Sequence, residues 1–331
     1  DRFSENDIRP DALMKEKQKA LQQDIDFLGA QCSKFVHVCC PACGLDNCKP
    51  WGSKSFCDYQ VCKECGCVYT NPRPSQELMH EFYAQSKNYE FWNKHIFPAS
   101  ESVRREKIFR PRAVSLIELC AKYEIRSGGK LLEVGSAFGT FAECASETGF
   151  FSRIVCVEPT PNLAETCRGK GLEVIEAPIE KVKLEENSFD VIASFEVIEH
   201  LFSPIEFVKS CGNLLNGKGL LILTCPNSES VGPLLLREEA TGFDHEHVNY
   251  FTPHSIEVFL ERCGFEIVEI STPGVLDIDI LKRDIIKTDV EMPLMRLLLA
   301  RMNQADSWEL QKIIQNTRLS SHMWVVAGKA E

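Results

Sequence analysis

From about residue 110 the chain alternates between segments typical of helices and short apolar segments typical of strands. The strand-like segments lie at 130–134, 153–158, 189–195 and 219–225, and the third is apolar enough to be buried on both faces. Alternation of this kind predicts an α/β fold with a mostly parallel, doubly wound, Rossmann-like sheet. Ligands of such sheets bind beyond the carboxyl ends of the strands, so functional residues are expected there.

The remainder of the chain predicts how this sheet ends. Thr252 and Pro253 are expected to start a helix, the segment 265–271 reads as a strand, and 322–329 reads as its antiparallel partner. The intervening segment 276–318 has a helical pattern and is predicted to form a small C-terminal helical cap.

A tight turn follows the first strand, in the stretch LLEVGSAFGTF (131–141). Gly135 and Gly139 bracket this turn and would let a ligand approach the backbone closely. The next strand ends at Glu158, where a carboxylate can accept hydrogen bonds from both hydroxyls of a ribose. A domain that binds NAD or a nucleotide-sugar is the alternative interpretation of the turn, although the middle position of a GxGxxG motif is Ala137 here.

Together with FDVIASFEVIEHL (189–201), these motifs resemble those of the class I S-adenosylmethionine-dependent methyltransferases. The resemblance implies that four residues surround the amino-acid part of S-adenosylmethionine, and these are Glu133, Gly135, Ser136 and Gly139. It further implies that Glu158 binds the ribose, that Ile179 packs on the adenine, and that Phe195 and Glu196 lie near the sulfonium.

Two CxxC pairs precede this region, in CCPACG (39–44) and VCKECG (61–66). Each pair places two thiolates on a tight knuckle, and two knuckles supply the four soft ligands that tetrahedral zinc prefers. The predicted ligands of this zinc ribbon are Cys40, Cys43, Cys62 and Cys65, with Cys39, Cys48, Cys57 and Cys67 as possible substitutes. Four thiolates close the coordination shell, so a structural zinc ion is favoured over a nucleic-acid-binding role.

The predicted organisation has four parts: an N-terminal helix within 1–38, the zinc ribbon at 39–72, a helical linker or pocket wall at 73–109, and the methyltransferase domain at 110–331. In the linker, four aromatic residues are expected to pack in a core rather than line a pocket, and these are Tyr83, Tyr89, Phe91 and Trp92. In the cap, Lys282 and Arg283 are expected to be solvated surface charges, with phosphate binding as the alternative.

The loop 226–252 leaves the carboxyl edge of the sheet and contains FDHEHVNYFT (243–252). His247 is the candidate general base for a substrate hydroxyl, with Glu246 or Asp244 orienting it. His245 is a further candidate catalytic residue, although its alternation with His247 is expected to point it to the other side. Two alternatives stay open, namely a polar loop that is only tied down by hydrogen bonds and a second metal site. His200 is a less favoured candidate base.

The ribbon, the sheet and this loop together resemble bacterial sugar methyltransferases, including zinc-containing deoxysugar C-methyltransferases. The resemblance implies that Glu246 and His247 lie next to the reacting sugar carbon. Asp244 stands where those enzymes have a tyrosine, and the chain is shorter after the loop, as in methyltransferases of surface-polysaccharide assembly. We therefore expect methyl transfer to a hydroxyl of a sugar, nucleotide-sugar or glycan precursor. C-methylation of a keto-deoxysugar nucleotide and a non-catalytic binding module are the alternatives.

The net charge of −11 disfavours a protein that grips phosphate backbones, so a nucleic-acid partner is not expected and an RNA methyltransferase is a weaker hypothesis. No apolar run approaches the length needed to insert in a membrane. The remaining cysteines lie in apolar, core-like stretches, which favours reduced thiols and a cytoplasmic location. The sequence does not indicate the oligomeric state.

Overall fold

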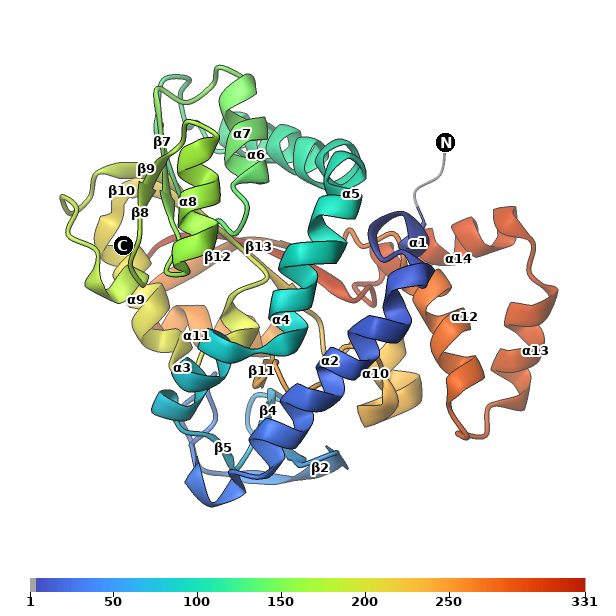
Figure 1. Ribbon diagram of the computed structural model, residues 1–331. Coiled ribbons are helices and arrows are strands. Elements are labelled where there is room, and N and C mark those ends of the chain that lie inside the picture. Colours follow the sequence, from blue (N-terminus) through green and yellow to red (C-terminus); the bar gives the residue numbers. More distant parts are fainter. Residues whose placement is uncertain (1–3, 331) are drawn as a thin grey trace.

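A seven-stranded sheet forms the centre of the computed structural model, which describes residues 4–330 (Figure 1). In spatial order its strands are β12 (Phe265–Ser271), β13 (His322–Lys329), β10 (Leu215–Pro226), β9 (Phe189–Phe195), β6 (Lys130–Val134), β7 (Arg153–Val157) and β8 (Glu173–Ile175). Six of these strands run in the same direction, and β13 runs antiparallel to them. The predicted doubly wound α/β fold is confirmed, including the antiparallel hairpin at one edge.

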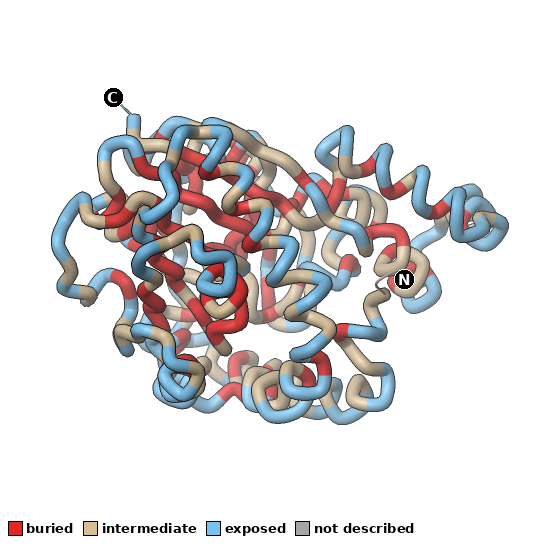
Figure 2. The backbone as a smooth tube through the Cα atoms, turned by 90° about the horizontal axis from the view of Figure 1, so that it is seen from above, coloured by how far each residue is buried: buried red, intermediate tan, exposed pale blue. Residues whose placement is uncertain are grey.

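Helices cover both faces of this sheet and bury its apolar side chains. On one face α6 (Arg110–Lys122) and α7 (Thr140–Glu147) contribute residues such as Leu116 and Phe141 to a shared core. On the other face α9 (Pro204–Leu214) and α11 (Pro253–Arg262) contribute residues such as Phe207 and Phe259. Figure 2 shows buried residues along the inner layer and exposed residues on the outer turns of the helices. The helix α8 (Pro161–Gly169) connects β7 to β8.

A second, four-stranded sheet contains the cysteine pairs. It is built from β2 (Cys48–Lys54), β3 (Cys57–Cys62) and β4 (Val68–Thr70), and its fourth strand is β11 (Asn249–Tyr250). Because β11 belongs to the loop after β10, a segment of the second half of the chain completes the sheet of the N-terminal ribbon. Next to it, β1 (Phe35–Val36) pairs with β5 (Arg73–Pro74).

Helices from the N-terminal third extend along one side of the molecule (Figure 1). After α1 (Glu5–Ile8), the long helix α2 (Asp11–Gly29) lies beside α4 (Lys87–Phe91), and α3 (Gln76–Gln85) precedes α4. The chain then stays helical through η2 (Trp92–Ile96), α5 (Phe97–Arg104) and η3 (Arg105–Phe109) into α6. The segments η2 and η3 are π-helical turns, a geometry that is frequent near functional sites.

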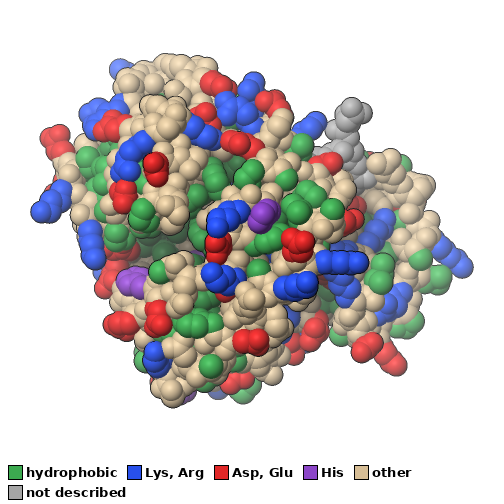
Figure 3. Space-filling model, in the orientation of Figure 1, with side chains coloured by type: hydrophobic (Ala, Val, Ile, Leu, Met, Phe, Trp, Pro, Cys, Tyr) green, Lys and Arg blue, Asp and Glu red, His purple; other side chains and the backbone are tan. Residues whose placement is uncertain are grey.

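The C-terminal cap forms a separate lobe on the right of Figure 1. It consists of α12 (Asp277–Lys287), α13 (Pro293–Arg301) and α14 (Gln304–Asn316), with α10 (Val231–Leu236) packed against α12. On the face drawn in Figure 3, acidic and basic side chains are interspersed over the surface. Within residues 4–330, no helix combines the length and the apolar character that crossing a bilayer requires.

Candidate active site

A large cavity of about 1860 Å³ lies at the carboxyl ends of β6, β7, β9 and β10. Its opposite walls come from α2, α4, α12 and the loop after β10. Ligand pockets usually measure about 300–1,000 Å³, so this cavity has room for two ligands side by side. Gly135 and Glu158 lie at one end of it and His247 at the other.

The glycine turn, residues 135–139, lies directly after β6 and has three residues with left-handed backbone. Gly135, Ala137 and Gly139 have φ angles of 80°, 46° and 69°. A Cβ atom on Gly135 would come within 2.5 Å of Val197, and one on Gly139 within 2.5 Å of Leu172. The turn therefore requires glycine at both positions. Gly135 lines the cavity, whereas Gly139 does not and instead starts α7.

Glu158 is buried at the end of β7 and holds the glycine turn in place. Its two carboxylate oxygens accept hydrogen bonds from the backbone N–H groups of Ala137 (2.8 Å) and Thr160 (2.9 Å). Burial raises the pKa of this carboxyl, and the N–H donors oppose that effect. Each oxygen keeps a second lone pair, so the group can also accept hydrogen bonds from a ligand in the cavity.

Glu133 and Ser136 lie at the same end of the cavity and are both buried. Burial raises the pKa of Glu133 to about 8, and the nearby Arg112 only partly opposes this. The carboxyl is therefore largely protonated at neutral pH in the absence of a ligand. Ile179, in η4 (Ile179–Lys181), forms a buried apolar part of the wall. All three residues thus line the cavity, and their contacts with a cofactor stay a prediction.

Glu196 follows β9 with a φ of 55° and its side chain reaches across β10 to β13. Its Oε1 accepts a hydrogen bond from Thr224 Oγ1 (2.7 Å) and lies at ion-pair distance, 3.1 Å, from His322 Nδ1. Burial alone would raise the pKa of Glu196, but His322 and Arg112 outweigh it and lower the value to about 2. Phe195, the preceding residue, also lines the cavity.

His322 is a cavity residue that the sequence did not single out. It is the first residue of β13 and pairs with Pro226 at the carboxyl end of β10. The available signal was topological, because an antiparallel strand begins at the edge where its parallel neighbours end. His322 Nδ1 lies 3.1 Å from Glu196 Oε1, so this carboxylate holds the imidazole ring at the cavity wall.

The histidine loop, residues 243–250, is folded around the carboxylate of Asp244. Asp244 Oδ1 accepts hydrogen bonds from the N–H groups of Glu246 (2.9 Å) and His247 (3.0 Å). His247 Nδ1 donates to the carbonyl of Gly242 (3.1 Å) and lies 3.3 Å from Asp244 Oδ2. Burial by itself lowers the pKa of His247, but the carboxylates of Asp244 and Glu199 raise it to about 9.

His200 packs against His247, with ring centroids 4.6 Å apart. Its Nδ1 lies 3.1 Å from Tyr83 Oη and 3.2 Å from the carbonyl oxygen of Glu246. Burial and the neighbouring His247 lower the pKa of His200 to about 3, so this ring is neutral. Its position is that of a packed support for the loop.

His245 points away from His247, towards the N-terminal helices. It is buried against Phe82, and its Nε2 lies 3.8 Å from Glu246 Oε1 and 4.0 Å from Asp24 Oδ2. Within residues 4–330 this nitrogen has no hydrogen-bond partner. Glu246 accepts a hydrogen bond from Asn88 Nδ2, which connects the loop to α4.

Aromatic residues of the linker line the cavity, contrary to the expectation of simple core packing. Tyr83, Tyr89 and Trp92 all face it. The chain places them there because α3, α4 and η2 form one wall of the cavity rather than a separate helical core. Phe91 does not line the cavity and packs against His95.

The ribbon holds the histidine loop through one buried arginine. Arg73 donates to the carbonyl of Thr70 (3.1 Å), to Asn249 Oδ1 (3.0 Å) and to the carbonyl of Val248 (3.2 Å). Asn249 in turn donates to the carbonyls of Ile198 (3.0 Å) and Leu201 (2.7 Å). Ribbon, histidine loop and the segment after β9 therefore form one hydrogen-bonded unit.

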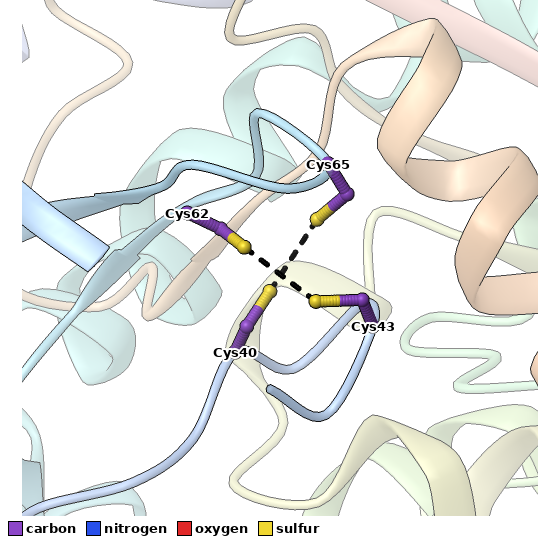
Figure 4. A group of neighbouring side chains, drawn as sticks. All are labelled: Cys40, Cys43, Cys62 and Cys65. Atoms are coloured by element: carbon purple, nitrogen blue, oxygen red, sulfur yellow. Dashed lines mark hydrogen bonds between the residues drawn. The ribbon is translucent and has the colours of Figure 1, made fainter. Parts of the chain in front are cut away.

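The four predicted cysteine ligands converge at one point (Figure 4). The Sγ–Sγ distances are 3.5 Å for Cys40–Cys65 and 3.5 Å for Cys43–Cys62, and all four sulfurs lie within 4.8 Å of one another. Tetrahedral zinc with Zn–S bonds of about 2.3 Å requires sulfurs about 3.8 Å apart, so the cluster is compatible with zinc. The four substitute cysteines are not part of this group.

Basic side chains line the outer part of the cavity, where α2 and α12 face it. Lys17 lies there without an ion-pair or hydrogen-bond partner among the described residues. Arg283 also lines the cavity and pairs with Glu5 and Asp284, so the expectation of a solvated surface charge was wrong for it. Lys282 donates to Ser307 (2.8 Å) and lies outside the cavity.

Fold and site define an α/β protein with a ligand cavity at the carboxyl edge of its sheet, arranged as in the class I methyltransferases. The chain matches the family described as a methyltransferase domain over residues 104–270, half of its length. It therefore belongs to this methyltransferase family. A solved structure of the complex between the Haloferax volcanii Trm112 methyltransferase activator and a methyltransferase has a similar fold, with a TM-score of 0.51, 10% identity, and coverage of 73% of this chain and 98% of that one.

Three curated relatives illustrate the range of this similarity. A probable S-adenosylmethionine-dependent methyltransferase, Rv3030 of Mycobacterium tuberculosis, is 39% identical over 62 residues, which are 19% of this chain and 23% of the relative. The ubiquinone biosynthesis O-methyltransferase of Xylella fastidiosa is 23% identical over 160 residues, which cover 44% of this chain and 64% of the relative. The C-methyltransferase NovU of Streptomyces niveus is 25% identical over 166 residues, which cover 48% of this chain and 38% of the relative. The chain thus spans between 23% and 64% of the length of these relatives.

Proposed function

We propose that this protein transfers a methyl group from S-adenosylmethionine to a hydroxyl of a sugar, nucleotide-sugar or glycan precursor. The observation that carries the proposal is the shared cavity, which joins Gly135 and Glu158 at one end to His247 at the other. Its volume of about 1860 Å³ suits a cofactor and an acceptor bound together. The unpaired Lys17 and the paired Arg283 in its outer part favour an acceptor with a phosphate or other anionic group.

The residues at the glycine-turn end fit this cofactor. Glu158 would accept hydrogen bonds from the ribose hydroxyls, Ile179 would pack on the adenine, and Glu133 would face the amino group of the methionine part. When bound, S-adenosylmethionine supplies an electrophilic methyl group on a sulfonium. The protein contributes positioning, because in-line displacement depends on how the acceptor oxygen is aligned with the methyl carbon.

His247 would act as the general base. Its Nδ1–H is donated to the carbonyl of Gly242, so the neutral ring presents Nε2 as the proton acceptor. The acceptor oxygen would lose its proton to Nε2 as it attacks the methyl carbon, and the bond from sulfur to that carbon would break. Asp244 would stabilise the resulting imidazolium, and Glu246 would hold the loop against Asn88. His245, which is turned to Asp24, would support the loop without touching the acceptor.

A panel of nucleotide-sugars and glycan precursors, incubated with S-adenosylmethionine, tests this function. Formation of S-adenosylhomocysteine together with a methylated sugar supports it, and the reaction should be lost in His247→Ala. Cofactor binding without turnover on every member of the panel would contradict it and favour a non-catalytic binding module.

C-methylation of a keto-deoxysugar nucleotide is a second candidate, favoured by the likeness to NovU over 48% of this chain. In that reaction His247 would remove a proton from the carbon next to a carbonyl group. The carbon chemical shift of the transferred methyl group distinguishes the two products, because a methyl on oxygen and a methyl on carbon differ strongly in shielding.

We also propose that the four cysteines bind a structural zinc ion. The four thiolates are soft ligands at tetrahedral spacing and leave no open coordination position for a substrate. Measurement of the zinc content of purified protein, with Cys62→Ser as the comparison, tests this assignment.

A further inference from the structure

A cluster of one imidazole and two carboxylates lies between the histidine loop and α2. Asp24 comes from α2, and His245 and Glu246 come from the loop. His245 Nε2 lies 3.8 Å from Glu246 Oε1 and 4.0 Å from Asp24 Oδ2. The three residues can each turn one ligand atom to a common point, with all three atoms within 4.8 Å of one another. Two distant segments of the chain thus bring together donors of the kind that hold metal ions.

The Nε2 atom of His245 is buried at this point without a hydrogen-bond partner among residues 4–330. The side chain is only 2% exposed, and its ring packs edge-on against Phe82 with centroids 5.6 Å apart. A buried polar nitrogen that lacks a partner is costly and rare in folded proteins. The nitrogen faces two carboxylates that are both too distant for a hydrogen bond, so a group that the chain does not supply is expected among the three atoms.

The two carboxylates of the cluster also lack a counter-charge. In the part of the chain that the structure describes, neither Asp24 nor Glu246 forms an ion pair with a lysine or an arginine. Burial and the neighbouring Asp244 raise the pKa of Glu246, because nothing nearby fully compensates its negative charge. A cation bound among the three atoms would provide this compensation.

Hydrogen bonds from α4 and its N-cap hold the two carboxylates in this arrangement. Asp24 Oδ2 accepts from Ser86 Oγ (2.6 Å) and from the N–H of Asn88 (3.0 Å), and Oδ1 accepts from the N–H of Lys87 (2.8 Å). Glu246 Oε1 accepts from the side-chain amide of Asn88. Metal ligands in proteins are typically oriented by outer hydrogen bonds of this kind. The carboxylates are therefore preorganised before any ion binds.

We infer that Asp24, His245 and Glu246 bind a divalent transition-metal ion such as Zn²⁺ or Mn²⁺. The inference goes beyond the proposed function and uses none of the four clustered cysteines. The spacing of the three atoms would put an ion about 2.1–2.5 Å from each of them, close to the bonds of about 2.0–2.2 Å that zinc makes with nitrogen and oxygen. Imidazole with carboxylates suits ions of this class, whereas four thiolates favour zinc. The bound ion would fasten the N-terminal helix α2 to the histidine loop.

Titration of Mn²⁺ into the full-length protein, followed by the electron paramagnetic resonance signal of the free ion, tests this inference. The thiolates of the cysteine cluster are poor ligands for Mn²⁺, so they do not compete for the probe. We expect the wild type to bind one Mn²⁺ at this site and to release it when Zn²⁺, which usually binds such ligands more tightly, is added. Asp24→Asn and His245→Gln should each weaken the binding by about 100-fold or more, because each removes one of three ligand atoms.

Matched controls exist for both variants. Asp26→Asn changes an exposed carboxylate on α2, and His254→Gln changes an exposed histidine on α11. Both should bind Mn²⁺ like the wild type. The melting temperature gives a second measurement, since an ion that binds only the folded state should raise it in the wild type and the controls but not in Asp24→Asn or His245→Gln.

Two results would overturn the inference. One is a wild type that binds neither Mn²⁺ nor any zinc beyond that of the cysteine cluster. The other is binding that survives Asp24→Asn or His245→Gln, which would place the ion at another group of ligands. Because neither cofactor nor acceptor enters the experiment, its outcome is independent of the proposed methyl transfer.

Discussion

The glycine turn and the histidine loop open into the same cavity, but the chain builds them in different ways. The glycine turn is local, because Gly135, Ala137 and Glu158 are joined by two consecutive strands and one hydrogen bond. The histidine loop is held by segments far away in the sequence, through Arg73 in β5 and Asn88 in α4. We call the part of the cavity next to the glycine turn its cofactor end and the part next to the histidine loop its acceptor end. The cofactor end depends on one strand–turn–helix unit, whereas the acceptor end is assembled from several parts of the chain. Changes that destroy the acceptor end should therefore leave the cofactor end intact.

Removal of the proposed zinc ion should separate the two ends of the cavity most strongly. The cysteine cluster fixes the ribbon, and β4 of the ribbon pairs with β11 of the histidine loop. In Cys62→Ser we expect the ribbon to lose its fold, methyl transfer to fall by about 100-fold or more, and the melting temperature to drop. Calorimetry should still detect binding of S-adenosylhomocysteine. Cys39→Ser changes an exposed neighbour outside the cluster and should behave like the wild type.

Replacement of His247 should affect only the acceptor end. For His247→Ala we expect methyl transfer to fall by about 10²- to 10⁴-fold, the contribution usually made by a general base. Affinity for S-adenosylhomocysteine should stay within twofold. The exposed His254 on α11 provides the control His254→Ala. Full activity of His247→Ala would show that this residue only ties down the loop and would direct attention to His322.

Replacement of Glu158 should affect only the cofactor end. Glu158→Ala removes the carboxylate that is proposed to bind the ribose hydroxyls and that accepts hydrogen bonds from two backbone N–H groups. We therefore expect about 10- to 100-fold weaker binding of S-adenosylhomocysteine. Turnover at saturating cofactor should change little. Glu165→Ala, on the exposed side of α8, is the matched control. A loss of turnover with unchanged affinity would reverse the roles assigned to the two ends.

The pH profile should sharpen the contrast further. With a pKa of about 9, His247 is protonated at neutral pH, and a base must be neutral to accept a proton. Methyl transfer should therefore rise about tenfold per pH unit from pH 7 and level off above pH 9. Asp244→Asn keeps an acceptor for the N–H groups of Glu246 and His247 but removes the charge that raises the pKa. Its profile should shift to lower pH, and an unshifted profile would contradict the assignment.

The two ends also differ in how far the sequence predicts them. Glycine spacing and the acidic residue at the end of the next strand are local signals, and they single out Gly135, Ser136 and Glu158, all of which line the cavity. Their contacts with a cofactor stay predictions. Arg112 and His322 carry no local motif, and they reach the cavity only because α6 and β13 pack against the sheet. The expectation that the aromatic residues of the linker pack in a core was wrong for a similar reason, because their position at the cavity depends on how the linker helices pack against the rest of the protein. Amphipathic periodicity shows that a face is covered and does not show whether protein or ligand covers it.

The pairing of β11 with β4 has a consequence for engineering and for evolution. The matched methyltransferase region begins at residue 104, after the ribbon, yet its acceptor loop is fastened to residues that precede that point. A chimaera that exchanges only the loop between relatives would place new side chains on an unsuited support. A change of acceptor specificity should therefore transfer most readily when the loop and the ribbon strands are exchanged together as one cassette.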